Sequence, residues 1–550
     1  MTTTGSGPGS RWRPRGRPAS GDRFPWLGLL VGLAALMAVA GGALWFTFDW
    51  LARVASVKAD QNAAIQGKDY VTAMLDAVKI ALSIVAGGGA LIALYLAMRR
   101  QRTAERDLRA RLDAQVHTED DAKARRVTEL YTKAADQLGS DKAPVRLAGL
   151  YALERLGQDN PDQRPTIANL WCAYLRMPYL AAPSVSPRPG SPRPLPRGHR
   201  RTVIRHSRPA ETSPKPATAQ AEAVLERDVR LSVQRLLAKH LRPPEHDHDH
   251  SNYWPEIPDL DLTEALLIDL DLSSCVLPVV RMDRAAFSGN TDFRGTTFSG
   301  AAWFERATFT GTARFAGATF AEGAVFSGET LTAATFSGAT FADTAQFDNT
   351  TFIKTAAFSG VTFTFSTFGG ARFIGTARFD SATFAKAAQF NRATFTESVY
   401  FSSAAFTDSA VFDSATFVSG AAFINTQFTT AVFIDAQFSV ARFVGAWFTD
   451  AAQFDSAQFT GSVLFDSATF TEVAQFGGAR FSGTVSFDRA MFGSDTTFGG
   501  AWFASVASCT EATVLSSGAE ALSSDWPPGW TCAVAEQTGE TLRLVPVPTG

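Results

Sequence analysis

Residues 305–320 read ERATFTGTARFAGATF, and this short stretch holds the pattern that organises most of the chain. Three times a small residue stands two positions before a phenylalanine, in Ala307-Thr308-Phe309, Ala313-Arg314-Phe315 and Ala318-Thr319-Phe320. Followed in both directions, the series runs from Phe287 to Phe503 over 41 positions, all of them Phe except Leu331. A fixed short period over this length is typical of a repeat architecture.

The steps between successive phenylalanines alternate between five and six residues. In an α-helix, residues five apart lie ~140° from one another around the axis, which would scatter the rings. A continuous strand needs a period of two. A chain that turns a corner after each short segment sends one side chain inward from every segment. The spacing therefore predicts a unit of about eleven residues, made of one five-residue and one six-residue segment.

These repeats resemble those of the pentapeptide repeat family, in which a buried Leu or Phe follows a small residue by two positions. The resemblance covers residues 281–503 and implies a right-handed quadrilateral β-helix of about ten coils. At ~4.8 Å per strand this is a rod ~45–50 Å long. Residues 257–277 read as degenerate Leu-centred repeats that start the solenoid, as in Leu270-Asp271-Leu272.

This sequence departs from the family pattern by one extra residue in every second step. Four of these longer steps are shortened to five residues without loss of phase: Leu331 to Phe336, Phe363 to Phe368, Phe428 to Phe433 and Phe438 to Phe443. Phe365 lies outside the series and is expected at the surface or at a corner. The period is expected to stop after Phe503, and residues 504–550 are the candidate cap over the open sheet edge.

Residues 24–98 are predicted to be a membrane anchor of two helices. Pro25 to Phe48 is almost wholly apolar and long enough to cross a bilayer, and a second span runs from about Ile80 to Met98. A cleaved signal peptide is the alternative for the first span, because Ala38-Val39-Ala40 imitates a cleavage site. Gly87-Gly88-Gly89 marks either a hinge or a packing notch in the second. Neither span carries the central charge that would mark an ion pathway.

Basic residues lie on the outer flanks of this pair. The tail, residues 1–23, holds five Arg against one Asp and is expected to be disordered. The second span is followed at once by Arg99, Arg100, Arg102 and Arg106, whereas the loop between the spans is balanced in charge. The positive-inside rule places both the tail and everything after Met98 in the cytoplasm, below the inner (plasma) membrane.

Residues 99–181 are predicted to form a cytoplasmic helical domain, with a charged helix to Leu138 and shorter helices over Val145–Leu156 and after Pro165. The stretch from Tyr131 to Leu156 resembles the helical segment that precedes the repeats in bacterial, often actinobacterial, membrane-tethered pentapeptide repeat proteins. The resemblance implies architecture and no activity. Its polar residues are expected to bond helix to helix, with a ligand or partner site as the alternative: Gln137, Arg146 and Glu154.

A Pro- and Arg-rich linker is expected at residues 182–220, either solvated or held on anionic lipid by its charge. A helix and an N-terminal solenoid cap follow at 221–280. Within them His246, His248 and His250 alternate with Asp247 and Asp249. We predict no structural metal site there, because no second cluster completes one; ion binding by this loop is the alternative.

The chain shows no phosphate loop, no GxSxG elbow and no HExxH motif. Four cysteines stand far apart, without metal-ligand spacing: Cys172, Cys275, Cys509 and Cys532. Free thiols are expected, with a Cys509–Cys532 disulfide as the alternative. We therefore expect no enzyme, no cofactor and no metal ion.

Two function classes remain. The first is a membrane-anchored, non-catalytic scaffold that presents a rigid rod to an unidentified protein partner, with self-association open. The alternative is mimicry of DNA, since some pentapeptide repeat proteins resemble duplex DNA and bind DNA gyrase. Mimicry needs an acidic face, and residues 281–503 hold 18 acidic against 13 basic side chains, a net charge of only −5. Direct binding of nucleic acid is not expected.

Overall fold

The computed structural model describes residues 26–57, 67–179, 216–244, 252–515, 525–534 and 542–547. The basic tail, the centre of the expected linker and the run with His246, His248 and His250 lie outside the described residues. The chain divides into two compact units, Met1–Arg125 and Arg126–Gly550. Each unit is described by itself.

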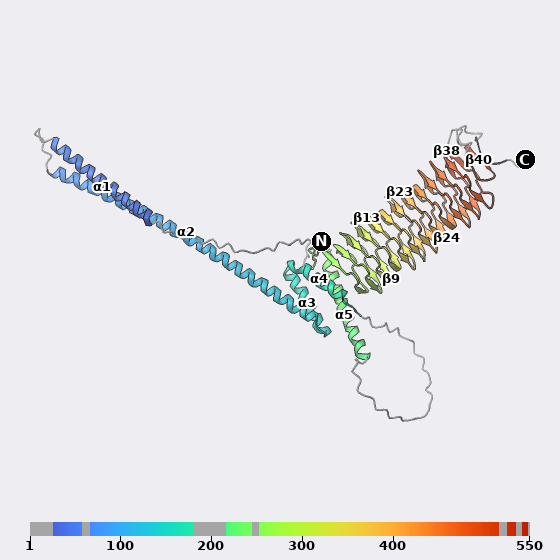
Figure 1. Cartoon of the computed structure of the whole chain (residues 1–550), viewed down its shortest axis with the longest axis horizontal. Helices are drawn as coiled ribbons and strands as arrows, with labels where there is room; N and C mark the ends of the chain where they lie inside the picture. Colours follow the sequence, from blue (N-terminus) through green and yellow to red (C-terminus); the bar gives the residue numbers. More distant parts are fainter. Residues whose placement is uncertain are drawn as a thin grey trace, which may run out of the picture. The chain divides into compact units, whose positions relative to one another are not determined.

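The first unit holds helix α1 (Trp26–Val57) and most of helix α2 (Gly67–Leu138) (Figure 1). Both helices are long and apolar enough to cross a membrane. α2 continues without a break through Gly87, Gly88 and Gly89, so these glycines are not a hinge. A Cβ atom on Gly88 would stand 2.3 Å from Leu36 Cδ1, so this glycine is the packing notch that lets α1 approach. The charged helix expected from Arg99 is the direct continuation of the second apolar segment.

The second unit begins with the end of α2 and three further α-helices: α3 (Ala143–Asp159), α4 (Arg164–Arg176) and α5 (Pro216–Leu241), with the short 3-10 turn η1 (Pro161–Gln163) between α3 and α4. Pro144 and Pro165 stand in the first turns of α3 and α4, where proline lacks no helical hydrogen bond. The apolar faces of these helices share one core with the first solenoid coil, through residues such as Leu150, Trp171 and Val233.

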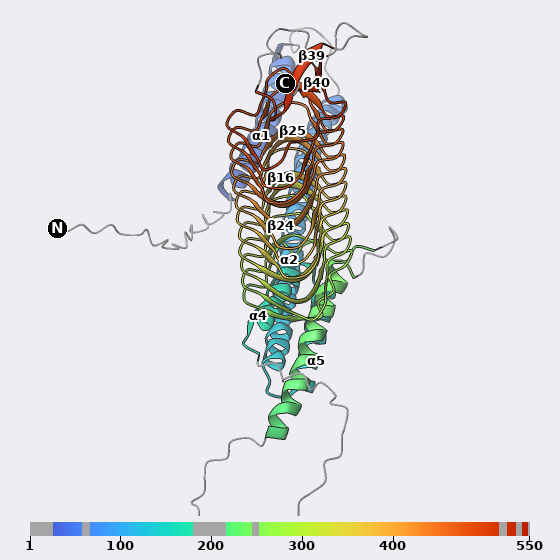
Figure 2. The ribbon, with the colours of Figure 1, turned by 90° about the vertical axis from the view of Figure 1, so that its right-hand side faces the viewer.

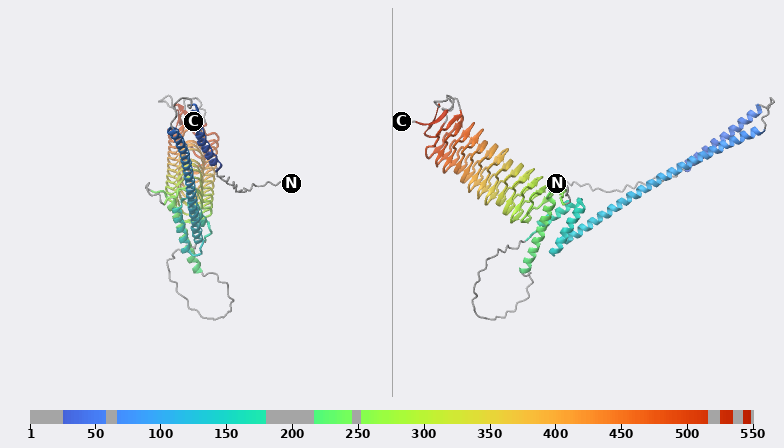
Figure 3. Two further views of the ribbon diagram at one scale, coloured as in Figure 1. Left: turned by 90° about the vertical axis from the view of Figure 1, so that its left-hand side faces the viewer. Right: turned by 180° about the vertical axis from the view of Figure 1, so that it is seen from behind.

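The rest of the second unit is a β-solenoid, whose short strands pair in parallel with those one coil earlier and later (Figures 1 and 3). In one register, for example, Phe320 pairs with Phe298 on one side and Phe341 on the other. Along each coil the chain visits two sheets in turn.

The first sheet takes two sides of every coil and contains these strands: β1 (Asp259–Asp261), β3 (Val276–Leu277), β4 (Val279–Arg281), β7 (Thr297–Phe298), β8 (Ala302–Trp303), β10 (Thr319–Phe320), β11 (Ala324–Val325), β13 (Thr340–Gln346), β16 (Thr362–Thr367), β19 (Thr383–Phe384), β20 (Ala388–Gln389), β23 (Ala405–Val411), β25 (Gln427–Val432), β27 (Trp447–Phe448), β28 (Ala452–Gln453), β31 (Thr469–Phe470), β32 (Ala474–Gln475), β35 (Met491–Gly493), β36 (Thr496–Thr497), β38 (Thr513–Leu515), β39 (Trp530–Val534) and β40 (Leu542–Pro546).

The second sheet takes the other two sides and contains β2 (Leu266–Ile268), β5 (Ala286–Ser288), β6 (Thr291–Asp292), β9 (Thr308–Arg314), β12 (Thr330–Thr335), β14 (Thr351–Phe352), β15 (Ala356–Ala357), β17 (Arg372–Phe373), β18 (Ala377–Arg378), β21 (Thr394–Phe395), β22 (Val399–Tyr400), β24 (Thr416–Ala422), β26 (Gln437–Arg442), β29 (Gln458–Phe459), β30 (Val463–Leu464), β33 (Arg480–Phe481), β34 (Val485–Ser486) and β37 (Trp502–Phe503).

Stacked rings fill the interior of the solenoid, so the space that the ribbon encloses in Figure 2 is packed with side chains. Each coil sends four side chains inward, and these form four columns that begin at Leu262, Leu267, Leu272 and Leu277. Within a column, rings one coil apart lie parallel: Phe373 and Phe395 have centroids 4.8 Å apart at 7°. The small residue two positions earlier is buried as predicted, as Ala393 is before Phe395.

The solenoid makes about twelve turns, more than the phenylalanines alone predict. The Leu-centred repeats are complete coil sides, because β1 pairs with β4 and β2 with β5. At the other end, the prediction that the period stops after Phe503 is wrong. Cys509 and Val514 are buried and continue two columns, since Ser508 bridges Ser486 and Val514 pairs with Phe492. Cys and Val hide the period because neither is Phe.

Each coil has two kinds of corner: two lie in the six-residue steps, four of which are shortened in this chain, and two lie in the five-residue steps. Irregular registers occur in four strand pairings, each next to one of the four shortened steps: β12 with β9, β16 with β13, β25 with β23 and β26 with β24. The sequence therefore located these irregularities correctly. At the other two corners, every coil has a residue with φ between +54° and +72°, such as Gly338 and Ser403.

Both ends of the solenoid are covered. At the first coil, the side chain of Gln234 on α5 makes the two backbone hydrogen bonds that a neighbouring strand would make. Its Nε2 donates to the Ile268 carbonyl at 2.7 Å, and the Ile268 N–H donates to its Oε1 at 3.0 Å. At the last coil, β40 pairs antiparallel with β38 and β39. Trp526 packs against Phe492 with ring centroids 5.6 Å apart. Within the segment expected as the cap, β39 and β40 thus lie against the last edge of the first sheet.

Candidate interaction surfaces

The outer faces of the solenoid are flat, because the residue before each inward side chain points outward at the same height in every coil. One such row in the first sheet is uncharged over five coils: Thr297, Thr319, Thr340, Thr362 and Thr383. The opposite row, in the second sheet, holds Thr351, Arg372, Thr394 and Thr416 in successive coils. These rows have geometry suited to contact with another macromolecule and carry no nucleophile–base pair.

Exposed apolar side chains gather beside the second of these rows. Ile353, Ile374 and Val418 each follow an inward phenylalanine by one residue and are 40%, 39% and 53% exposed. Thr396 occupies the same position in the coil between Ile374 and Val418. We call these four residues the apolar strip. It was not recognised from the sequence, although the position after each Phe of this column can be read there.

Charges on the solenoid are mixed in sign. Several arginines pair with neighbouring acids, including Arg294 with Asp292 at 2.6 Å and Arg378 with Asp380 at 3.3 Å. The outward rows contain more Thr, Gln and Arg than acidic residues, so no outward row is a continuous acidic ladder. This distribution does not provide the negative face that mimicry of DNA requires.

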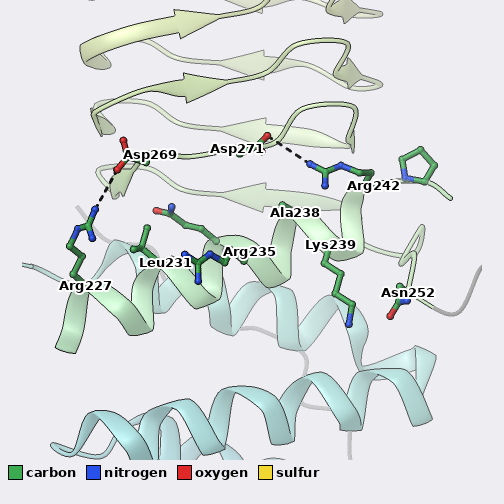
Figure 4. Close-up of a pocket in the computed structure, with 11 residues that line it drawn as sticks. Arg227, Leu231, Arg235, Ala238, Lys239, Arg242, Asn252, Asp269 and Asp271 are labelled. Carbon is green, nitrogen blue, oxygen red and sulfur yellow. Dashed lines mark hydrogen bonds and ion pairs between the residues drawn. The ribbon is translucent and has the colours of Figure 1, made fainter. Parts of the chain in front are cut away.

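A cleft beside the solenoid runs along α5, with a volume of about 810 Å³ (Figure 4). α5 supplies four cations to it: Arg227, Arg235, Lys239 and Arg242. Across the cleft, Arg227 pairs with Asp269 at 3.4 Å and Arg242 with Asp271 at 3.8 Å (Figure 4). These pairs are half exposed, so each contributes ~0–1 kcal/mol. Among the described residues that line this cleft there is no hydroxyl, thiol or imidazole group.

The polar residues singled out between Tyr131 and Leu156 hold helices together. Arg146 pairs with Glu226 of α5 at 2.9 Å, and Glu154 pairs with Lys239 at 2.7 Å. Glu226 also accepts a hydrogen bond from Arg230 at 3.0 Å and one from the Tyr174 hydroxyl. Burial is the main cause that raises the pKa of Tyr174. Gln137 contributes its backbone carbonyl to Ser140 at the end of α2. These contacts of Arg146 and Glu154 agree with the structural interpretation.

His240 was not singled out from the sequence; it is buried against two tryptophans, whose own rings stack with centroids 5.5 Å apart. Its ring centroid lies 3.8 Å from that of Trp254 and 6.0 Å from that of Trp171. Nδ1 donates to the Asn252 carbonyl at 2.5 Å, and Nε2 lies 3.3 Å from Glu154 Oε1. Burial outweighs these partners and lowers the pKa of His240. The stacked rings join α4, α5 and the chain leading to the first coil.

The cysteines are not arranged for chemistry. All four are buried free thiols. Burial raises the pKa of Cys172, Cys275 and Cys509 to about 12 in each case, so these thiols stay protonated near neutral pH and are poor nucleophiles. Over the ranges that the structure describes, no group of three or more His, Cys, Asp or Glu residues is placed to hold a metal ion.

A coil with four inward columns, parallel registers and covered ends defines a β-solenoid protein. The family described as pentapeptide repeats matches residues 283–330, 336–383, 443–491 and 454–502. The matched residues of the solenoid are therefore pentapeptide repeats. Repeats of this kind typically belong to structural or binding proteins.

No curated protein matches the chain. Among solved structures, QnrB1, a plasmid-mediated fluoroquinolone resistance protein, is 13% identical, with a TM-score of 0.13 over 43% of this chain and 89% of that protein.

Proposed function

We propose that the protein is a membrane-anchored, non-catalytic scaffold of bacterial type, whose pentapeptide repeat solenoid binds a protein partner in the cytoplasm. The observation that carries the proposal is the solenoid itself: its interior is filled by ring stacks, and its outside offers flat faces. A filled interior leaves no room for a substrate, so the surface is what the fold has to offer. The mixed charge favours this function over DNA mimicry.

The anchor part of the proposal rests on α1 and α2. Their apolar segments, Leu30–Trp50 and the part of α2 that begins at Val71, have only 6% of their most apolar windows buried, so little of the chain covers them. Exposed apolar helices of this length suit a bilayer. The Arg residues after Met98 favour a cytoplasmic solenoid by the positive-inside rule. We propose the same order of parts along the chain: a basic tail, a two-helix anchor, cytoplasmic helices, a linker and the repeats.

The topology is tested by cysteine accessibility in intact cells with an impermeant reagent. Asp60→Cys, in the loop between the spans, is expected to be labelled, and Ser299→Cys, exposed on the solenoid, is not. The native thiols are buried and give little background. Labelling at 299 but not at 60 would overturn the cytoplasmic location.

The partner is sought by proximity labelling from the C-terminus of the full chain in its host. We place the contact on the apolar strip, because exposed apolar side chains on a flat sheet are the surface that gains most from burial. Ile374→Asp is expected to abolish enrichment of the partner. Ala385→Asp is the matched control, since Ala385 follows its inward Phe in the same coil on the opposite face and is also exposed. Equal enrichment with both variants would exclude the strip; no enrichment even with the unaltered chain would contradict the scaffold.

A further inference from the structure

The fourth coil, residues 326–346, combines three departures from the common repeat. Glu329 stands where the coils before and after have Ala307 and Thr350, in a column of small buried residues. Leu331, two residues later, is the one member of the 41-residue series that is not Phe. The step from Leu331 to Phe336 is shortened, and the register of β12 against β9 shifts there. The family match also breaks between residues 330 and 336.

Glu329 is fully enclosed and its carboxyl group has no partner. The residue is 1% exposed, and neither carboxyl oxygen has a hydrogen-bond partner. The backbone of Glu329 keeps its hydrogen bond to the next coil, because the Thr351 N–H donates to the Glu329 carbonyl at 2.9 Å. In the next coil, the Thr350 hydroxyl at the equivalent position is satisfied by the Phe326 carbonyl. A buried ionised carboxylate without a partner is among the costliest groups in a protein, so this side chain is neutral in the closed coil.

The charged groups at the same corner do not relieve this cost. Arg284 pairs with Glu264 at 3.3 Å and Arg306 with Glu305 at 3.6 Å, and both arginine side chains are mostly exposed. Asp283, two coils earlier, accepts from Glu305 N–H at 3.0 Å and repels a negative charge on Glu329. Burial first, and Asp283 second, raise the pKa of Glu329 well above its usual range.

We propose that the fourth coil is a pH-dependent opening point of the solenoid, closed while Glu329 is protonated and opened when it ionises. This goes beyond the scaffold function, because it makes the rod divisible at one place. In a stack whose coils contact only their neighbours, opening one coil separates the three coils next to the α-helices from the eight that follow. The two sheet edges so exposed have unpaired backbone groups.

The sign follows from the carboxyl group. A folded-state pKa above the unfolded value gives stability that is complete below the unfolded pKa and is lost as pH rises towards the folded pKa. The fourth coil is therefore expected to weaken as pH rises above ~4.5, the ordinary range of a glutamate. Between the two pKa values, opening of this coil increases by up to about tenfold per pH unit.

Hydrogen–deuterium exchange of the full chain in detergent micelles tests the proposal, with rates corrected for intrinsic exchange at each pH. The ratio of opening in the fourth coil to that in the ninth coil, residues 433–453, is measured at pH 5.5, 7.0 and 8.5. For the unaltered protein we expect this ratio to rise at least tenfold over the range. In Glu329→Ala, which introduces the residue of the preceding coil, it is expected to stay constant.

Glu329→Gln separates ionisation from burial of a polar group. The amide cannot ionise, so the ratio is expected to be independent of pH, although opening is greater than in Glu329→Ala. A ratio that rises with pH in Glu329→Gln, or one that stays flat in the unaltered protein, overturns the proposal. If Glu329→Gln does not fold, the comparison of Glu329→Ala with the unaltered protein still decides it.

Discussion

Phe395 shows what a single inward ring contributes. It lies between Phe373 and Phe417, with centroid separations of 4.8 and 5.0 Å, and is fully buried. Phe395→Ala leaves a cavity between two rings that cannot close on each other, because the strands hold their spacing. We expect a loss of ~3–5 kcal/mol in the free energy of unfolding. Thr394→Ala, one residue earlier and outward, is expected to cost ~0.5 kcal/mol or less. Denaturant unfolding of residues 126–550 measures both.

Phe363 and Phe365 give a sharper comparison, since both are phenylalanines of strand β16. Phe363 is buried and stacks on Phe384 at 5.2 Å, whereas Phe365 is half-buried and pairs with Thr344 at a corner. We expect Phe363→Ala to cost ~3 kcal/mol or more and Phe365→Ala distinctly less. Equal losses would contradict the inward register of this coil, and with it the assignment of the shortened step from Phe363 to Phe368.

Individual residues were readable where spacing alone decides their position. The inward phenylalanines and the small residue before each follow from the period, whatever their neighbours. The corners with a left-handed backbone could not be predicted from the sequence. Arg306, Ser403 and Asn425 adopt positive φ there, and these three side chains share no chemical feature. Glu329 could have been found, since it is the acidic residue in a column of Ala and Thr. The cost of its burial, however, depends on the absence of partners, which only the structure gives.

Two glycines distinguish corner strain from close packing between coils. Gly338 has φ of +68° and open space around a Cβ atom, and a Cβ on Gly483 would stand 2.3 Å from the backbone of Gly461. Gly338→Ala is expected to cost ~1 kcal/mol, the ordinary price of a left-handed non-glycine residue. Gly483→Ala is expected to cost ~2–3 kcal/mol, because backbone must shift between two coils. Thermal unfolding ranks the two; a larger loss for Gly338→Ala would show that corner strain, and not coil contact, limits these positions.

The α5 cap can be weakened through one side chain. Gln234 satisfies both backbone groups of Ile268, which is itself buried. Gln234→Ala leaves an N–H and a C=O without partners at the first strand edge, so we expect a loss of ~2 kcal/mol or more. Arg235→Ala, on the neighbouring exposed position, is the control and is expected to have little effect. Similar stability for both variants would mean that water replaces the glutamine.

Helices were predicted close to their observed bounds where the composition of the sequence changes at the same position as the structure. They were predicted less well where the two do not coincide. Both apolar segments and the α3 and α4 helices were expected at nearly their observed positions. The division at Met98 was not a structural one, because the Arg-rich segment is as able to form helix as the apolar segment before it, and α2 runs through both. The contact between Gln234 and Ile268 joins residues 34 apart and leaves no local pattern in the sequence.

At the scale of the whole molecule, the solenoid behaves as a one-dimensional stack. Each coil contacts only the coil before and the coil after, so stability is a sum of coil terms and neighbour terms. The charges on the described solenoid are mixed in sign and its interior is filled with side chains, so its distinctive features are its shape and its outer surface.

A stack of this kind makes a definite statement about pairs of substitutions. Leu331 shows that one coil tolerates Leu in place of the ring, so Phe→Leu variants are expected to fold with losses of ~1–1.5 kcal/mol each. Phe309→Leu and Phe459→Leu lie seven coils apart in one column, ~34 Å at the strand spacing, and their losses are expected to add within ~0.5 kcal/mol.

Phe373 and Phe395 stack on each other, so Phe373→Leu and Phe395→Leu each remove the same ring–ring contact. The sum of the two single losses therefore includes the energy of that contact twice. Their double variant is therefore expected to lose at least ~0.5 kcal/mol less than the sum. Denaturant unfolding of residues 126–550 gives both differences. Strong coupling between the distant pair would contradict a stack in which each coil interacts only with its neighbours.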